Sequence, residues 1–417
     1  MNIIDELEWR GLIHSVSDRD KLKELSDKGI KVYLGVDPTA DSMHIGHLLP
    51  VIMLRRFQAF GHVPVSLSGG GTGQIGDPSG RSSERQLLDL ETIDKNVNNI
   101  RKQVESILDL ECDNKPIFLN NADWGNKISM FEFLRDYGKY FNINYMLAKD
   151  IVSSRLETGI SFTEFSYSIL QALDWLKMYE MYDVNMQIGG SDQWGNITSG
   201  LDLLRKKHPE SICVGLTMPL ITKSDGTKFG KTAGGAVWLD PKKTTPYEFY
   251  QFFLNTADGD VINYLKVFTF FTKEEIAHME NELKERPHER FAQKELARAI
   301  TTMVHSLEDY ERALEISQAL FSGDIKKLNI AEIKDSFKGV PESVIEESEM
   351  NIIDFLIATE ICKSKREARE FVSGNSITIN GDRINDVEFI VKKADAFDQE
   401  ITIVRRGKKN YFKVIFK

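Results

Sequence analysis

The first half of the chain alternates between short hydrophobic runs and longer stretches with helical periodicity. The run KVYLGVD (31–37) is rich in large apolar residues, which predicts a buried strand. The dense apolar pattern of HLLPVIMLRRFQAFG (47–61) predicts a buried helix, and VPVSL (63–67) predicts the next strand. A strand, a helix and a second strand at this spacing form a parallel α/β unit. Further strands are expected at PIFLNN (116–121) and VNMQIGG (184–190).

The pattern changes from Pro246 to Gly323, where helical periodicity is almost continuous. The expected fold class is therefore α/β. A Rossmann-like parallel-sheet domain over residues 1–222 is followed by a lysine-rich loop and a helical domain over 223–323. Residues 324–349 are acidic and poor in large apolar side chains, so a mobile linker is expected there.

Residues 350–417 predict a small separate α+β module. The sequence SKRE predicts a capping box of Ser364 and Glu367 that opens a short helix with basic residues on its outer face. SITINGDRI predicts a hairpin that turns on Asn380-Gly381, and QEITIVRRGKKNYFKVIF adds strands around a basic turn. A basic helix beside β-turns is typical of a small RNA-binding module, although a solvated charged surface is the alternative.

Composition is that of a globular protein, with 41% hydrophobic and 28% charged residues. We find no apolar run close to the roughly 18 residues that span a bilayer, and the start MNIIDELEWRGLIH does not resemble a signal peptide. A cytoplasmic protein is therefore expected. Three scattered cysteines, Cys112, Cys213 and Cys362, argue against a disulfide framework and against a cysteine zinc site.

The charge of the chain is unevenly distributed. The whole sequence carries a formal net charge of −10, which taken alone argues against a nucleic-acid partner. Residues 350–417, however, hold 13 Lys and Arg against 10 Asp and Glu (net +3), whereas residues 1–349 hold 40 against 53 (net −13). A basic module on an acidic body suggests that the module binds a polyanion; chance variation of the surface is the alternative.

The stretch PTADSMHIGH (38–47) places His44 and His47 directly after the first predicted strand. A zinc site would need a third ligand or a nearby general-base glutamate, which this stretch lacks, and two core histidines are a second interpretation. The third depends on position, because backbone N–H groups at the start of a helix that follows a parallel strand attract phosphate. Imidazoles there can donate hydrogen bonds to a reacting phosphoryl group, and Gly46 leaves room for a flat base.

The stretch SGGGTGQIGDPSGRSSER (68–85) contains the spacing G-x-G-x-x-G after a strand. In a dinucleotide-binding fold this motif opens a helix directly, whereas DPSG here predicts a turn. A P-loop is excluded because no Gly-Lys-Ser/Thr follows. We therefore expect a glycine-lined wall beside a ligand. It ends in one carboxylate and two arginines: Asp77, Arg81 and Arg85.

The stretch KSDGTKFGKT (223–232) places three lysines and two threonines around two glycines. A mobile loop of this kind can close over a triphosphate and hold its charge only while the chemistry takes place. A solvated surface turn is the alternative interpretation.

Together, HIGH and KFGKT resemble the two signatures of class I aminoacyl-tRNA synthetases. With GGSDQWGN (189–196) and YSILQALD (167–174) in the same order and spacing, the whole chain is similar to the bacterial tyrosyl-tRNA synthetases. Residues 350–417 resemble the RNA-binding module shared by a small-subunit ribosomal protein and many pseudouridine synthases. The family uses ATP with Mg²⁺ to convert L-tyrosine to tyrosyl-adenylate, then transfers the tyrosyl group to the 3′-terminal ribose of tRNA(Tyr). By the resemblance, neither step uses a covalent enzyme intermediate.

The resemblance implies roles for the matching residues. A catalytic set would hold the phosphates in the transition state: Thr39, His44, His47, Arg81, Arg85, Lys228, Lys231 and Thr232. Lysine is usual where Arg81 stands, and a guanidinium is not equivalent to an ammonium. An ATP-binding set would contact the nucleotide: Gly35, Asp37, His44, Gly46, His47, Gly190, Asp192, Gln193 and Lys231.

A further set would bind tyrosine, and by the resemblance Tyr33 and Asp174 hydrogen-bond the substrate phenol. A buried carboxylate and a buried hydroxyl are costly to leave unpaired, so phenylalanine is penalised. The α-ammonium group would be held by a clamp of three side chains, and one more residue completes the set: Asp77, Tyr167 and Gln171, with Gln187.

The expected partners are L-tyrosine, ATP, tRNA(Tyr) and a second copy of the chain in a homodimer; neither a membrane nor a protein-held metal site is expected. Three alternatives stay open at this point. They are a tryptophanyl-tRNA synthetase, a small-molecule nucleotidyltransferase that uses the same H-x-G-H motif, and an RNA-binding adaptor whose catalytic half has lost its activity. Tyr33 with Asp174 favours a phenol, and the basic module argues against the nucleotidyltransferase. Lys228 and Lys231 argue against the adaptor.

Overall fold

The computed structural model describes residues 2–417 except 80–86, 157–158, 225, 227–228, 233–234 and 408–409, and only the backbone at 150–151 and 231–232. The chain divides into two compact units. Residues 1–244 and 251–306 form the first unit, and residues 245–250 and 307–417 form the second. No helix among the described residues is both long and apolar enough to cross a membrane.

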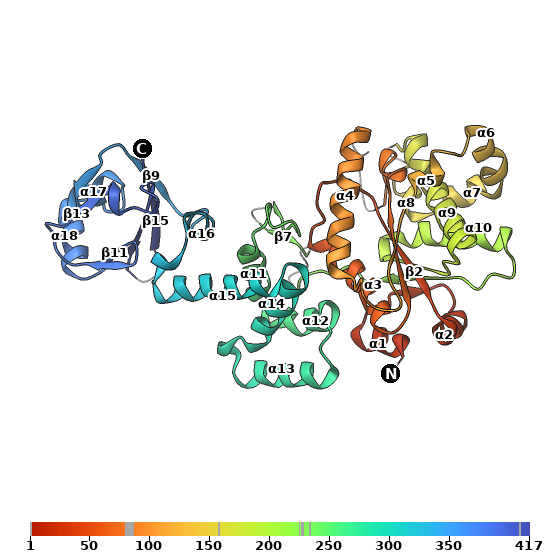
Figure 1. The fold of residues 1–417 in the computed structure, drawn as a ribbon, viewed down its shortest axis with the longest axis horizontal. Helices are drawn as coiled ribbons and strands as arrows, with labels where there is room; N and C mark the ends of the chain where they lie inside the picture. Colours follow the sequence, from red (N-terminus) through yellow and green to blue (C-terminus); the bar gives the residue numbers. More distant parts are fainter. Residues whose placement is uncertain are drawn as a thin grey trace. The chain divides into compact units, whose positions relative to one another are not determined.

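The first unit is built on a six-stranded sheet with the order β1-β6-β5-β2-β3-β4. Figure 1 labels β2 among the helices of this unit. All pairs are parallel except that of the short edge strand β1 with β6. Four predicted strands are confirmed as β2, β3, β4 and β5. The strands are β1 (Ser15–Val16), β2 (Lys31–Val36), β3 (Val63–Ser68), β4 (Ile117–Asn120), β5 (Met186–Gly190) and β6 (Val214–Met218).

The strand order reverses at β2. The chain runs outward from β2 to β3 and β4, and then returns to place β5 on the other side of β2. In open α/β sheets, ligands bind beyond the carboxyl ends of the strands at such a reversal. The fold therefore directs attention to the loops that follow β2, β3 and β5.

Helices pack against this sheet because its central strands are buried. Tyr33 points from β2 into a hydrophobic core with Trp175 of α9 and Leu201 of α10. Neighbouring residues of β2 point to the opposite face, where α3 packs against β2 and β3. The helices of this part are α1 (Ile3–Arg10), α2 (Arg19–Lys28), α3 (Leu48–Ala59), α4 (Leu90–Ile107), α5 (Ala122–Gly125), α6 (Met130–Glu132), α7 (Ile143–Leu147), α8 (Asp150–Ser153), α9 (Phe162–Tyr182) and α10 (Trp194–Lys207).

The predicted helical block is confirmed, and a two-stranded hairpin precedes it. The hairpin consists of β7 (Lys231–Thr232) and β8 (Gly235–Ala236). The helices are α11 (Pro246–Leu254), α12 (Asp258–Phe268), α13 (Lys273–Glu285), α14 (Phe291–Val304) and α15 (Leu307–Ser322). The first unit contains α12, α13 and α14, whereas α15 belongs to the second.

The second unit has a five-stranded sheet with the order β12-β11-β14-β15-β9, and a separate pair of β10 with β13. The predicted hairpin of β11 and β12 is confirmed: Asn380 and Gly381 both have positive φ, as a tight hairpin turn requires. The elements are α16 (Ile330–Ser336), β9 (Glu342–Ile345), β10 (Glu349–Asn351), α17 (Ile352–Ala358), α18 (Lys365–Ser373), β11 (Ile377–Ile379), β12 (Asp382–Ile384), β13 (Ile390–Lys392), β14 (Ile401–Arg406) and β15 (Asn410–Phe416).

The prediction of a mobile linker over residues 324–349 is corrected by these contacts. The segment contains α16 and β9, and β9 pairs in parallel with β15. Ile333 and Phe337 are buried against Ile401 and Ile403 of β14. A few large apolar side chains on one helix face are enough to hold this acidic segment on the module. The other predicted domain boundaries stay predictions.

The predicted capping box of α18 is half right. Ser364 is the N-cap and its side chain accepts the Glu367 N–H, at 3.2 Å. The Glu367 carboxylate, however, accepts the N–H of Lys363 at 2.7 Å instead of that of Ser364. The basic residues predicted on the outer face of this helix are exposed: Lys365, Arg366 and Arg369.

Candidate active site

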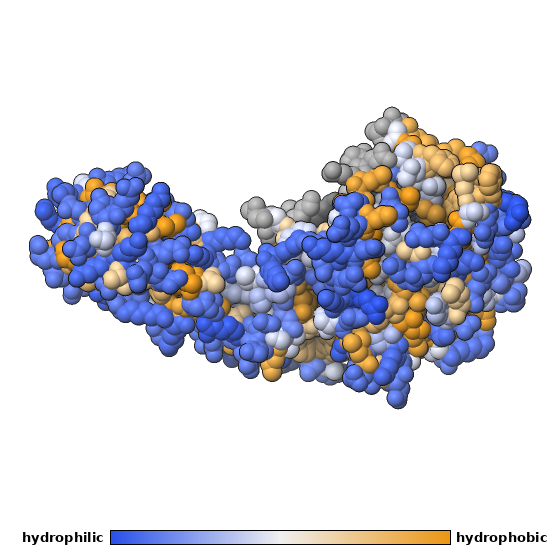
Figure 2. Space-filling view, turned by 45° about the horizontal axis from the view of Figure 1, so that its top comes forward, coloured by the Kyte–Doolittle hydropathy of each residue, from blue (hydrophilic) through white to orange (hydrophobic). Residues whose placement is uncertain are grey.

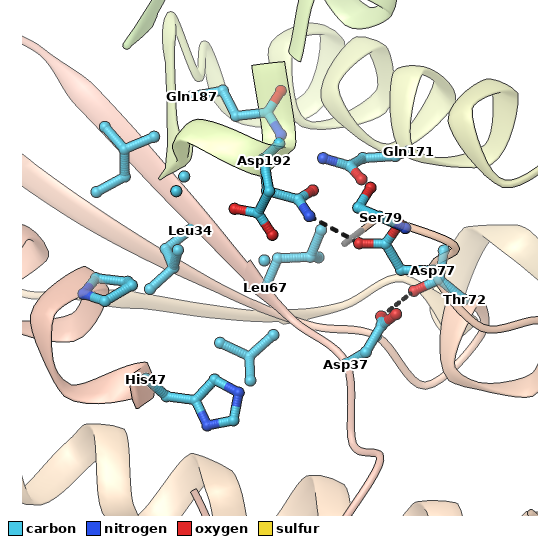
Figure 3. Close-up of a pocket in the computed structure, with 18 of the residues that line it drawn as sticks. Leu34, Asp37, His47, Leu67, Thr72, Asp77, Ser79, Gln171, Gln187 and Asp192 are labelled. Carbon is cyan, nitrogen blue, oxygen red and sulfur yellow. Dashed lines mark hydrogen bonds between the residues drawn. The ribbon is translucent and has the colours of Figure 1, made fainter. Parts of the chain in front are cut away.

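A cavity of about 350 Å³ lies at the carboxyl ends of β2, β3 and β5, where the strand order reverses (Figure 3). It brings together every residue of the three predicted sets whose side chain or glycine backbone the structure describes. These lining residues are Tyr33, Gly35, Asp37, Thr39, His44, Gly46, His47, Asp77, Tyr167, Gln171, Asp174, Gln187, Gly190, Asp192 and Gln193.

Tyr33 of β2 and Asp174 of α9 form one part of the wall, and both are buried. The Asp174 carboxylate accepts hydrogen bonds from Asn121 Nδ2 and from Trp124 Nε1, each at 2.8 Å. Within the described part of the chain, neither Tyr33 Oη nor Gln187 Oε1 has a hydrogen-bond partner, although both atoms are buried. Unpaired buried polar atoms are costly, so this wall fits a ligand that carries a polar group of its own.

Burial shifts the pKa values of the two ionisable side chains in this part of the wall, Asp174 and Tyr33. It raises the pKa of Asp174 to about 7, while the hydrogen bonds from Asn121 and Trp124 act in the opposite direction. Burial and the nearby Asp174 carboxylate also raise the pKa of Tyr33 well above its usual range. The Tyr33 phenol therefore stays protonated at neutral pH, whereas Asp174 titrates close to neutrality.

Asp37, at the carboxyl end of β2, connects three parts of the wall. One of its carboxylate oxygens accepts a hydrogen bond from Thr72 Oγ1 at 2.7 Å (Figure 3). The other accepts one from Tyr167 Oη at 2.8 Å. Asn121 Nδ2 also donates to Thr72 Oγ1, at 2.9 Å. The predicted ATP contact Asp37 thus holds two other lining side chains in place.

A second carboxylate network surrounds Asp77. Gln193 Nε2 donates to its Oδ2 at 2.8 Å (Figure 3). The Ser79 N–H donates to its Oδ1 at 2.9 Å. The fully buried Asn196 donates to Ser79 Oγ and to Gln193 Oε1. Together with Asp37, Asp174 and Asp192, this makes four carboxylates in the wall, and the described lining residues include no Lys or Arg. The cavity therefore favours a cationic group such as an ammonium.

The two histidines stand together at the start of the helix that follows β2. Residues Ile45–His47 form a 3-10 turn that leads into α3, and the two rings stack with centroids 4.1 Å apart. His44 Nδ1 accepts the Gly46 N–H at 3.0 Å, and His47 Nδ1 accepts the His44 N–H at 3.3 Å. Burial lowers the pKa of His44, so its ring is neutral at pH 7. Because Nδ1 accepts in both rings, each Nε2 carries the hydrogen and is a donor.

Both parts of the chain match descriptions of known protein families. Residues 25–322 match the tRNA synthetases class I (W and Y), and residues 332–414 match the tyrosine–tRNA ligase SYY-like C-terminal domain. The tyrosine–tRNA ligase of Listeria monocytogenes serotype 4a is 56% identical over 419 residues, which cover 100% of both chains. The chain belongs to the tyrosine–tRNA ligase family.

Other members of the tyrosine–tRNA ligase family agree with this. Tyrosine–tRNA ligase 1 of Enterococcus faecalis is 54% identical over 414 residues, which cover 99% of both chains. The crystal structure of a C-terminally truncated Aspergillus nidulans mitochondrial tyrosyl-tRNA synthetase superposes with a TM-score of 0.69 at 33% identity, covering 77% of this chain and 94% of that one. The predicted family and the predicted α/β fold class are thus confirmed.

Five residues of the predicted catalytic set cannot be placed in this tyrosine–tRNA ligase family site. Arg81, Arg85 and Lys228 lie outside the described residues, and only the backbone of Lys231 and Thr232 is described, in β7. The neighbouring glycine of the loop is placed, however: a Cβ on Gly230 would lie 2.8 Å from Ile45 Cγ1 of the histidine turn. The described part of the lysine loop therefore touches the histidine segment.

Several residues of the site escaped the sequence analysis. Asn121 and Trp124 bind both oxygens of Asp174. Thr72 donates to Asp37, and Ser79 donates to Asp77. Asn121 follows β4 directly, so the rule that ligands bind at the carboxyl ends of parallel strands could have found it. Trp124 gave no comparable signal.

The segment with the rejected dinucleotide spacing forms only a short turn. The segment of Gly71, Gly73 and Gly76 forms only a three-residue 3-10 turn, Thr72–Gln74, and a Cβ on Gly73 would lie 2.9 Å from Pro38. It is a wall segment that does not open a long helix. In the part of the chain that the structure describes, no three His, Cys, Asp or Glu side chains are grouped so that they could hold a metal ion.

Proposed function

We propose that the protein activates L-tyrosine with ATP and charges tRNA(Tyr) with the product. One observation supports this most directly. A single cavity is lined by Tyr33, Gln187 and Asp174, which suit a phenol, by the carboxylates, which suit an ammonium, and by the two histidines at a helix start, which suit phosphates. Full-length similarity to tyrosine–tRNA ligases supports the same assignment.

In the first step, a carboxylate oxygen of tyrosine attacks the α-phosphorus of ATP. The bond from this phosphorus to its bridging oxygen breaks, pyrophosphate leaves, and tyrosyl-adenylate remains. The protein supplies position and charge stabilisation and no nucleophile. His44 and His47 would donate from Nε2 to phosphate oxygens, and Thr39 together with Arg81, Arg85, Lys228, Lys231 and Thr232 would complete the phosphate-binding set. Mg²⁺ would travel with the phosphates of ATP and partly neutralise them.

The amino acid would bind in the buried part of the cavity. Its phenol would pair with Tyr33 and Asp174, and its ammonium group would lie among Asp77, Tyr167 and Gln171. The nucleotide would use the remaining residues of the wall: Gly35, Asp37, Gly46, Gly190, Asp192 and Gln193. In the second step, a hydroxyl of the 3′-terminal ribose of the tRNA attacks the acyl carbon, and AMP leaves.

The decisive experiment is ATP–pyrophosphate exchange with purified protein. We expect exchange that depends on tyrosine and that tryptophan does not support. The buried Tyr33 Oη can donate to the oxygen of a phenol, whereas an indole N–H is a donor only and offers Tyr33 no acceptor. Folded protein without tyrosine-dependent exchange would end the proposal. Exchange with tryptophan alone would indicate the tryptophan branch of the same family.

The rate at limiting tyrosine should depend on the protonation of Asp174. The pKa of Asp174 is about 7, so kcat/KM for tyrosine should fall as the pH falls through this value. Trp124→Phe removes a hydrogen bond that lowers this pKa, so the acidic limb of the profile should move to higher pH. Trp9→Phe, on α1, is the matched control and should leave the profile unchanged. If the acidic limb of the pH profile lies at the same pH in Trp124→Phe and in Trp9→Phe, the role of Asp174 is contradicted.

The remaining proposals concern the assembly of the protein. We propose a homodimer, supported by large hydrophobic side chains that are exposed around α6, α7 and the start of α9: Met130, Phe131, Leu134, Ile143 and Phe162. Figure 2 shows hydrophobic residues gathered on this part of the first unit. Exposed apolar patches of this kind mark association surfaces. For the second unit we propose tRNA binding, as its similarity to the C-terminal domain of these ligases supports.

The proposed homodimer can be tested by the molecular mass of the protein in solution. Light scattering should give twice the mass of the chain, and Phe162→Asp should shift the protein toward monomer, because it places a charge in the buried interface. Phe321→Asp, in the second unit, is the control, since Phe321 is also exposed, at 94% against 76% for Phe162, but lies outside this patch. A wild-type mass of one chain at micromolar concentration would contradict the proposal.

A further inference from the structure

Helix α12 connects the two segments that would hold the phosphates of ATP. At its first turn, Asp260 Oδ1 accepts the N–H of Ser224, at the start of the lysine loop, at 2.9 Å. Ser224 also lies against Gly259, where a Cβ would be 3.8 Å from Ser224 Oγ. The helix thus holds the beginning of the loop through a backbone hydrogen bond that does not depend on the side chain at position 224.

The side of α12 packs against Phe229, near the other end of the lysine loop. The Phe229 ring lies 5.0 Å from that of Tyr264, edge-on, and 5.1 Å from that of Phe268, stacked. Phe252 and Phe253 of α11 complete this aromatic cluster. Gly230 follows directly and lies against Ile45, between the two histidines. Aromatic packing therefore determines how closely the loop approaches the histidine turn.

The far end of α12 is bonded to α3, the helix that follows the histidine turn. Arg56, fully buried on α3, donates from Nη2 to the carbonyl of Thr269, the C-cap residue of α12, at 2.9 Å (Figure 1 shows the two helices). Arg10 donates to the carbonyls of Lys266 and Thr269, and Glu6 bridges the two arginines. Two guanidinium groups at a helix C-terminus satisfy carbonyls that would otherwise lack partners.

The carboxylate of Asp260 is used in an unusual way. Asp260 is the third residue of α12, a position from which an acidic side chain commonly reaches back to the N-cap. The N-cap here is Ala257, which provides no side-chain cap, yet the buried Asp260 accepts from the loop. From this geometry we infer that Asp260 and Phe229 are positioning residues, which hold the lysine loop in register with His44 and His47. The inference rests on the proposed function.

Four variants of the full-length protein test this. Asp260→Ala removes the acceptor, so kcat for tyrosine-dependent exchange should fall about tenfold while KM for tyrosine stays within about twofold. Asp260→Asn keeps an acceptor oxygen without the charge and should recover most of the rate. Asp258→Ala is the matched control, because it removes a carboxylate from the same turn that bonds Gln293 and not the loop. Phe229→Leu should show the same loss of kcat as Asp260→Ala.

A second measurement does not depend on activity. Trypsin should cleave after the lysines of residues 223–231 faster in Asp260→Ala than in the wild type, and at the wild-type rate in Asp258→Ala. Equal cleavage of all three proteins would overturn the inference. So would an unchanged kcat in Asp260→Ala, an equal loss of kcat in Asp258→Ala, or no recovery in Asp260→Asn. Absence of exchange in the wild type would instead refute the proposed function and leave the proteolysis result to decide.

Discussion

Asp174→Ala is expected to lower kcat/KM for tyrosine by about 10²- to 10³-fold. The substitution removes the buried carboxylate that would accept the substrate phenol. It also leaves Asn121 Nδ2 without one of its two acceptors and removes the carboxylate oxygen to which Trp124 Nε1 donates. KM for ATP should change by less than about threefold, because the histidine segment and the carboxyl end of β5 are untouched. The ratio of kcat/KM for tyrosine to kcat/KM for phenylalanine should decrease.

Asp123→Ala is the control for this experiment. Asp123 precedes Trp124 on α5, but it is exposed and does not line the cavity. Pyrophosphate exchange with varied tyrosine, phenylalanine and ATP separates the three effects. A variant of Asp174 that loses tyrosine and ATP affinity equally would show that the phenol has been assigned to the wrong part of the cavity.

Removal of the residues after Ser322 is expected to abolish most tRNA charging and to spare adenylate formation. The rate of tyrosine-dependent exchange should stay within about twofold, whereas charging should fall by about 100-fold or more, since basic side chains provide much of the affinity for RNA. Ser322 is the end of α15 and of the match to the class I synthetases. A cut at residue 350 would instead separate α16 and β9 from the strands on which they pack.

Replacing Lys365, Arg366 and Arg369 together with alanine tests the same unit in the intact chain. The three residues are exposed on α18, so their loss should leave the fold and the exchange rate unchanged and lower charging about tenfold. Aminoacylation of tRNA(Tyr) at several salt concentrations measures the effect. Charging at the full rate by the truncated protein would exclude a role of the second unit in tRNA binding.

The parts of the molecule that sequence patterns predicted correctly are those with strong local signals. The strand over 31–37 and the helix after it are dense in apolar residues, and the confirmed helical block has long, regular periodicity. The predicted site residues meet in one cavity because they stand on β2 or β5, in the segments that follow β2, β3 and β5, or on the long helix α9. The positions of such residues follow from topology alone.

Other features depend on contacts between distant residues, which no local pattern encodes. Trp124 reaches Asp174 across 50 residues, and only the folded chain shows that its indole donates to the carboxylate. The segment 324–349 was predicted as a linker from its acidic composition. Composition conceals that Ile333 and Phe337 meet Ile401 and Ile403 on the neighbouring sheet. The Glu367 carboxylate likewise accepts the N–H of Lys363, one residue before the N-cap residue that the capping pattern assigns as its partner.

The parallel pairing of β9 with β15 has a kinetic consequence. Its first partners are Glu342 and Lys413, so the sheet of the second unit is completed only after the chain closes a loop of about seventy residues. The hairpin of β11 and β12 and the helix α18 use only near neighbours and can form early. Contacts between residues far apart in the sequence form slowly. We therefore expect the pairing of β9 with β15 to limit the folding rate of the second unit.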